Sequence, residues 1–134
     1  MAPGDWPLVP GTDTDFDVRP VQHLLNQWGA GLAVAGRFGP PTTASIKKFQ
    51  SMKGLIPDGV VGNQTWPRLI VRVQSGSNGD AVRAVQALVG IDQDGVFGPV
   101  TDTHVREFQQ TFGAHVDGIV GPETWRLLVL PKSE

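Results

Sequence analysis

Two stretches of the sequence place an aspartate before a glycine and follow them, a few residues later, with a threonine and a tryptophan. They are residues 58–66, DGVVGNQTW, and residues 117–125, DGIVGPETW. An aspartate in such a turn can accept backbone N–H groups, while the glycine after it can adopt a positive φ. Alternatively, the carboxylate can contact a ligand, and an exposed indole can stack on the apolar face of a sugar ring. Both alternatives describe turn formation or binding rather than covalent chemistry.

The polar residues around these turns have the same two interpretations. Gln50 and Gln109 each follow a phenylalanine of an expected helix, where the amide can hold the backbone of the turn or form hydrogen bonds with a ligand. Thr65 and Thr124 stand at expected helix starts, so we expect their hydroxyls to cap backbone amides. The two tryptophans lie at helical spacing from a leucine, which favours packing in the core over a sugar platform.

The sequence lacks the motifs that carry out hydrolysis or bind metals. The chain has no cysteine, so it has no thiol nucleophile, no thiolate metal site and no disulfide. His23, His104 and His115 lack the spacing of a zinc motif, and we expect them to be surface residues. Neither a Gly-x-Ser-x-Gly elbow nor a phosphate-binding loop occurs. The sequence therefore predicts no catalytic residue, no metal site and no cofactor.

The two stretches belong to a duplication that covers most of the chain. Trp66 and Trp125 lie 59 residues apart, and the same shift places residues 38–40 on residues 97–99, both of which read Phe-Gly-Pro. Upstream the shift is 64, so the first copy contains five additional residues, which we place in the glycine- and alanine-rich stretch 29–36. Such a register predicts two copies of one small domain.

A first helix is predicted in each copy, because apolar residues recur at helical spacing over residues 18–28 and again from residue 82 onward. Its candidate caps are acidic or amide side chains just before these segments. They are Asp15 or Asp17 in copy one and Asn78 or Asp80 in copy two.

Two more helices are predicted in each copy. The second covers residues 41–53 and 100–112 and ends at a glycine. The third carries the tryptophan; Pro122 begins it in copy two, whereas Pro67 falls a turn later and should make the helix of copy one short or irregular. The predicted fold is therefore all-α, with two tandem three-helix repeats and short Asp-Gly turn segments.

The chain is long enough for two units of this kind but not for larger ones. About 60 residues is close to the lower limit for a self-supporting core, so we expect the two repeats to pack on each other. Residues 1–13 have the Pro, Gly and Asp composition of an extended leader, in which Trp6 is able to dock onto repeat one. The expected boundaries are 1–13 for the leader, 14–71 for repeat one, 72–130 for repeat two and 131–134 for a tail.

Charge and hydropathy limit the partners and the location. The net charge is −2 without any block of like charges, which argues against nucleic acid as a partner. No apolar segment approaches the ~20 residues of a membrane span, and no secretory signal is visible, so we expect a soluble chain whose export signal is missing or already removed. The copies differ in charge, +2 over residues 12–70 and −3 over residues 71–130, so we expect them not to bind one feature equally.

A gapped pattern of residues resembles the peptidoglycan-binding domain 1 family. In copy two the pattern runs Val85-Gln86-x-Leu88, Asp94-Gly95-x-Phe97-Gly98-x-x-Thr101, Val105-x-x-Phe108-Gln109 and Asp117-Gly118-x-Val120-Gly121-x-x-Thr124-Trp125-x-x-Leu128. Copy one matches the same segments but departs at Ala35, where the family favours aspartate, and in its five additional residues. The resemblance covers roughly residues 12 to 130 as two tandem copies.

The resemblance implies a non-catalytic, cell-wall peptidoglycan-binding protein or targeting module whose partners are the glycan and stem peptides of the bacterial wall. Shallow grooves beside the Asp-Gly turns are the expected sites. The candidate ligand-binding residues are Asp58, Gly59, Thr65, Trp66, Gln50, Asp94, Phe97, Gln109, Asp117, Gly118, Thr124 and Trp125.

Two other roles remain open from the sequence. The chain could be a structural or adaptor component of a phage tail or contractile particle, using its repeats for protein contacts or wall anchoring. It could also be the wall-targeting part of a cell-wall hydrolase, endolysin-like in its organisation. A wall-binding role places the protein in the cell wall or outside the cell if it is exported, and the adaptor role places it in the cytoplasm or on a particle.

Overall fold

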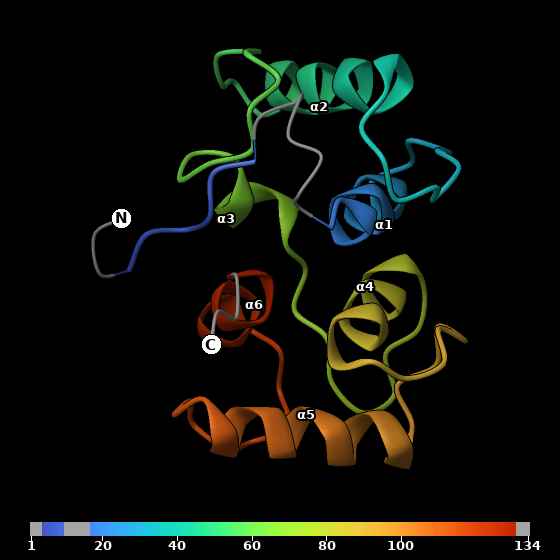
Figure 1. Cartoon of the computed structure of the whole chain (residues 1–134), viewed down its shortest axis with the longest axis vertical. Coiled ribbons are helices and arrows are strands. Elements are labelled where there is room, and N and C mark those ends of the chain that lie inside the picture. Colours follow the sequence, from blue (N-terminus) through green and yellow to red (C-terminus); the bar gives the residue numbers. More distant parts are fainter. Residues whose placement is uncertain (1–3, 10–16, 131–134) are drawn as a thin grey trace.

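The computed structural model describes residues 4–9 and 17–130, and in this part of the chain the regular secondary structure is helical, joined by turns, loops and isolated β-bridges. Figure 1 shows the helices in two stacked groups, with α2 (Pro40–Met52) and α5 (Pro99–Thr111) at the two ends and the other helices between them. The all-α prediction is confirmed. The helices are α1 (Arg19–Gln27), α2 (Pro40–Met52), α3 (Trp66–Leu69), α4 (Asp80–Val89), α5 (Pro99–Thr111) and α6 (Pro122–Val129).

Glycine and proline set the limits of the helices. Helices α2, α5 and α6 each begin with a proline, where the missing N–H would have no partner inside the helix. After α2 and α5 the chain reverses at Gly54 and Gly113, which have φ of 72° and 78°. The third helix has four residues in repeat one and eight in repeat two. This difference confirms the predicted effect of Pro67, which cannot donate a backbone hydrogen bond.

The candidate caps Asp17, Asn78 and Asp80 do not occupy the cap positions of the first helices. Val18 and Gly79 occupy the cap positions, and neither helix has a capping bond from the side chain of its own cap residue. Asp17 instead binds Arg19, through both the backbone N–H and the guanidinium. Asp15 lies outside the described residues.

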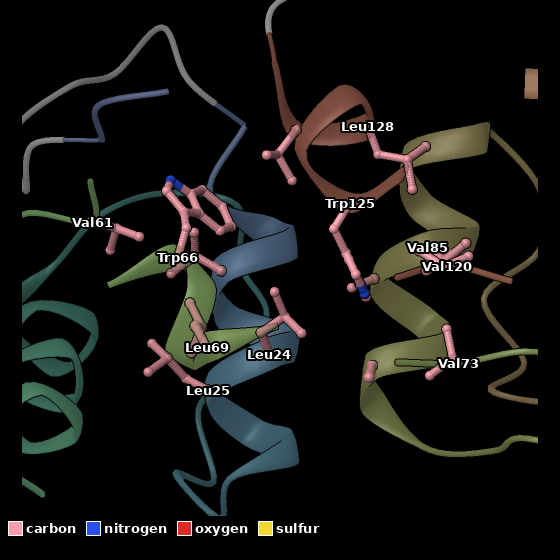
Figure 2. Close-up of a cluster of buried hydrophobic side chains, with 14 of the residues drawn as sticks. Leu24, Leu25, Val61, Trp66, Leu69, Val73, Val85, Val120, Trp125 and Leu128 are labelled. Atoms are coloured by element: carbon pink, nitrogen blue, oxygen red, sulfur yellow. The ribbon is translucent and has the colours of Figure 1, made fainter. Parts of the chain in front are cut away.

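The two repeats pack on each other along α1 and α4. Their buried side chains join into one cluster, in which Trp66 and Trp125 are both fully buried. Figure 2 shows each tryptophan among the apolar side chains of its own repeat. A continuous core explains how two units of about 60 residues hold a stable fold, because each covers apolar surface that the other would leave exposed.

Two side chains of α1 cross this interface with hydrogen bonds. The side-chain oxygen of Gln27 accepts the backbone N–H of Ala81 at 2.9 Å, so repeat one caps the first turn of α4. His23 contacts the Gln93 side-chain oxygen through Nε2 at 2.9 Å. Our expectation of a surface histidine is wrong for His23, which is buried at the junction because α4 covers this face of α1.

The described part of the expected leader is an integral part of repeat one. Val9 is fully buried and forms an antiparallel bridge with Val61, with N–H to oxygen distances of 2.9 and 3.0 Å. The indole N–H of Trp66 donates to the Pro7 carbonyl at 2.8 Å, and the Trp6 ring stacks on Trp66 with a centroid separation of 5.8 Å. Residues 4–9 of the expected leader are thus extended and complete the core of repeat one, and Trp6 docks onto this repeat, as the sequence analysis allowed.

Repeat two is closed in the same way by the segment that joins the repeats. Val73 pairs with Val120, and the indole N–H of Trp125 donates to the carbonyl of Val71 at 2.8 Å. Residues 71 and 73 lie 64 positions after residues 7 and 9, which is the upstream shift of the duplication. Each structural repeat therefore begins with a short extended segment before its first helix.

Candidate functional site

A buried glutamine organises each Asp-Gly turn, and the turn around Asp117 shows how. The Gln109 amide NH₂ donates to Asp117 Oδ1, to the carbonyl of Ile119 and to the Thr124 hydroxyl at 3.0 to 3.1 Å. Its carbonyl oxygen accepts the backbone N–H of Gly118 at 3.0 Å. Asp117 Oδ1 also accepts the N–H of Ile119 at 2.9 Å. One amide therefore fixes the turn, the aspartate and the start of the next helix together; we call this arrangement the Asp117 corner.

The same arrangement occurs at two more places. Gln50 organises the Asp58 corner, with bonds of 3.0 Å to Asp58, Val60, Gly59 and Thr65. An Asp94 corner is built in the same way by a glutamine of α4; it comprises Gln86, Asp94, Gly95, Val96 and Thr101.

A fourth glutamine forms an incomplete corner in repeat one. Gln22 donates to the Arg37 carbonyl and the Thr42 hydroxyl and accepts the N–H of Gly36, so the backbone is held as in the other corners. Ala35 stands where the others have aspartate, so this corner lacks the carboxylate. Alanine in place of aspartate at position 35 thus removes the acidic group, and the turn keeps its fold.

A groove opens beside each of the three corners that carry an aspartate. The Asp58 groove and the Asp94 groove each have a cavity volume of about 490 Å³, and the Asp117 groove has about 170 Å³. Each contains the corner aspartate and threonine together with exposed side chains of neighbouring loops. The exposed lining includes Leu8, Ile56 and Gln64 in the Asp58 groove, Asp92, Val96 and Val100 in the Asp94 groove, and Arg72, His115 and Glu123 in the Asp117 groove.

Comparison with known proteins identifies the family to which the chain belongs. The model of the family described as "Putative peptidoglycan binding domain" matches residues 14–69 and 78–128. The chain belongs to this peptidoglycan binding domain family. One match lies over the helices of each structural repeat, and together they confirm the tandem peptidoglycan-binding arrangement indicated by the sequence.

Three curated proteins are similar to part of this chain. A zinc D-Ala-D-Ala carboxypeptidase of Streptomyces albus G is 33% identical over 116 residues, which cover 80% of this chain and 43% of the relative. An N-acetylmuramoyl-L-alanine amidase, CwlM, of Mycobacterium tuberculosis is 35% identical over 108 residues, which cover 66% of this chain and 26% of the relative. An uncharacterized protein in the bpoA1 3′ region of Kitasatospora aureofaciens is 45% identical over 73 residues, which cover 53% of this chain and 62% of the relative. The chain therefore spans less than two thirds of each relative.

The structure separates the predicted site residues of the peptidoglycan binding domains into buried and accessible groups. The Asp58 and Asp94 side chains are exposed and that of Asp117 is half-buried, and all three line grooves. The remaining predicted residues are buried and form the framework of the corners and the core. They are Gly59, Gln50, Thr65, Trp66, Phe97, Gln109, Gly118, Thr124 and Trp125.

The structure agrees with core packing, the favoured interpretation of the two tryptophans, and it corrects the role expected for the two threonines. Trp66 and Trp125 have no exposed surface, so neither ring offers a sugar platform in this structure. Thr65 and Thr124 do not cap helix amides with their hydroxyls, because each hydroxyl accepts a hydrogen bond from the glutamine of its corner. The predicted alternative for the glutamines, that the amide holds the backbone of the turn, is the one observed.

Sequence reasoning missed the exposed residues that give each groove its chemical character. Leu8 and Ile56 are distant in sequence and come together only through the fold. It also missed a usable signal, the spacing Gln-x7-Asp-Gly-x5-Thr, which begins at Gln50, Gln86 and Gln109. That spacing marks each corner and, with it, each groove.

The corners also influence the ionisation of their aspartates. The backbone N–H of Ile119 holds the pKa of Asp117 below its usual value, with the Gln109 amide acting in the same direction and partial desolvation opposing both. The N–H of Val96 and the Gln86 amide similarly lower the pKa of Asp94. Both groups are therefore carboxylates at neutral pH and act as hydrogen-bond acceptors.

The lowered pKa values of Asp94 and Asp117 predict how the stability of the fold depends on pH. A carboxyl whose pKa is lower in the folded chain stabilises the fold above its unfolded pKa, about 3.8, and this contribution disappears as the pH falls through the folded value. We expect the urea midpoint of the wild type to fall more between pH 6 and pH 2 than that of an Asp94→Asn, Asp117→Asn double variant. Urea unfolding at several pH values measures this, and parallel profiles would contradict the linkage.

Within residues 4–9 and 17–130, no three acidic or histidine side chains gather where they could hold a metal ion. In the same part of the chain, no helix has both the length and the apolar character needed to cross a bilayer.

Proposed function

We propose that this chain binds bacterial peptidoglycan without cleaving it and that the corner grooves are its binding sites. Family membership supports the ligand class. The observation that carries the proposal is the recurrence of one preorganised corner three times, each with a carboxylate at the edge of a groove. Recurring sites suit a polymer that repeats the same chemical units.

The corners are suited to binding because their polar groups are fixed before a ligand arrives. In each corner, the buried amide and the turn backbone hold Oδ1 of the aspartate. The carboxylate keeps further acceptor capacity, which can take the hydroxyl or amide hydrogens of a wall fragment. Little ordering of the protein is then required on binding, so less affinity is lost to conformational entropy.

Affinity for the wall arises from several weak sites acting together. Open grooves of this size bury only part of a ligand, and a single groove should therefore bind modestly. Because the repeats form one continuous core, the three grooves are held on a common body. A chain bound at one groove presents the others to the same polymer at high effective concentration, which raises avidity without new contacts.

The relatives favour wall targeting as the use of this binding. Two of them are named as a carboxypeptidase and an amidase, and the chain covers 43% and 26% of their lengths. We infer that the repeats place a protein at the cell wall, where an associated hydrolase could act on the same polymer. This role would put the chain in the cell wall or outside the cell.

Sedimentation with purified insoluble peptidoglycan tests the proposal. We expect wild-type protein to sediment at low salt and an Ile56→Glu, Val100→Glu variant to bind roughly tenfold more weakly, since it adds charge to two grooves. Both side chains are exposed, so the substitutions should leave the fold intact. Met52→Glu, an equally exposed change away from the corners, is the matched control. Folded wild-type protein that stays wholly in the supernatant would overturn the proposal.

A further inference from the structure

The Asp58 groove and the Asp117 groove occupy the same place in their repeats but have different linings. Both flank the third helix and contain the corner aspartate and threonine. The duplication relates their exposed residues position by position, with a shift of 64 before the first helix and 59 after it. Three equivalent positions of the lining carry chemically different side chains in the two grooves. Leu8, Ile56 and Gln64 of the Asp58 groove correspond to Arg72, His115 and Glu123 of the Asp117 groove.

The Asp58 groove is mainly apolar. Leu8 and Ile56 are 67% and 81% exposed, so the groove presents two large aliphatic side chains to a ligand. Leu8 lies over the backbone of Gly62, where a Cβ would come within 3.1 Å of its Cδ1. Among the described residues that line it, Asp58 alone is ionisable, so the groove repels carboxylates and offers an acceptor to neutral donors.

The Asp117 groove is smaller and carries both signs of charge. Arg72 and His115 supply donors or positive charge, and Asp117 and Glu123 supply negative charge. Glu123 accepts the backbone N–H of His115 at 3.3 Å, which links two walls of the groove. Such a lining suits an ionised group, because each charge of the ligand meets one of opposite sign.

We propose that the two grooves have diverged in specificity, the Asp58 groove binding an uncharged N-acetylated sugar and the Asp117 groove binding a carboxylate-bearing peptide. This inference rests on the proposed function and identifies which part of the wall polymer each groove holds. A pyranose presents an apolar face to Leu8 and Ile56 and hydroxyl or amide hydrogens to Asp58. A peptide carboxylate meets Arg72, whose guanidinium matches carboxylate geometry.

NMR titration of the full chain with two probes tests the inference. The first probe is chitotetraose, an uncharged N-acetylated glycan, and the second is a synthetic stem tetrapeptide with free carboxyl groups. We expect chitotetraose to shift the amide signals around Ile56 and Val60, and the tetrapeptide to shift those around His115 and Ile119. Equal shifts at both grooves with either probe would overturn the inference.

Exchange of the linings provides a matched control in both directions. One variant carries Leu8→Arg, Ile56→His and Gln64→Glu, and the reciprocal variant carries Arg72→Leu, His115→Ile and Glu123→Gln. All six side chains are exposed, and urea unfolding verifies that each variant is folded. We expect each exchange to weaken the original probe roughly tenfold at the altered groove and to favour the other probe there. Preferences that stay with the original groove would overturn the inference.

Failure of the inference and failure of the proposed function are distinguishable. If neither probe binds while the wild type still sediments with insoluble peptidoglycan, the assignment of the grooves is wrong and the proposed function stands. If the folded wild type also fails to sediment, both are wrong.

Discussion

Replacement of Gln109 by leucine lowers the free energy of unfolding by about 3 to 4 kcal/mol, the largest loss we expect from one side chain of the corners. Among the described residues, this amide makes five hydrogen bonds, and leucine can replace none of them. The N–H of Gly118 and the hydroxyl of Thr124 would be left buried without that partner. An unpaired buried polar group costs about 1 to 3 kcal/mol, and several act here together.

Urea unfolding followed by tryptophan fluorescence measures the loss, because Trp125 lies in the core of the same repeat. Gln110→Leu is the matched control, since it makes the same chemical change at the exposed neighbouring position of α5. Gln22→Leu should cost less than Gln109→Leu, at about 2 kcal/mol, because that corner lacks the carboxylate and three hydrogen bonds are found for its glutamine. Equal midpoints for Gln109→Leu and Gln110→Leu would show that the corner does not stabilise the fold.

Local patterns in the sequence were sufficient to predict the elements of each repeat. The periodicity of apolar residues gave all three helices in each copy, and Pro67 correctly marked α3 as the short one. The Asp-Gly turns were predicted because their chemistry is local: Asp58 accepts the N–H of Val60, and Gly59 has φ of 77°. These interactions span two residues, so the sequence shows both partners at once.

Interactions between segments that are distant in the sequence could not be predicted from local patterns. The side chain that accepts the Ala81 N–H in the first turn of α4 is Gln27, which lies 54 residues earlier in the chain. No local rule for helix caps identifies such a partner. His23 looks like an isolated polar residue until α4 is packed over it. The linings of the grooves likewise combine Leu8 with Ile56, so their character emerges only when the chain is folded.

Deletion of residues 1–9 should destabilise the chain by about 3 to 5 kcal/mol, although their composition resembles that of a loose leader. The deletion removes Val9, which is fully buried, and the Pro7 carbonyl that accepts the Trp66 indole N–H. It also removes the Trp6 ring stacked on Trp66. Water would then reach a tryptophan that is otherwise fully buried, so we expect red-shifted fluorescence as well as a lower urea midpoint.

A point variant separates this packing effect from the shortening of the chain. Val9→Asp keeps the full length and places a carboxylate where the side chain of residue 9 has no access to water, so it should reproduce most of the loss. Val9→Ile keeps an apolar side chain at that position and should change the midpoint much less. Repeat two is closed by Val73 in the equivalent place, and Val73→Asp should give a loss of similar size. If the deletion and both aspartate variants leave the midpoint unchanged, the extended segments do not complete the repeats, and each would consist of its three helices alone.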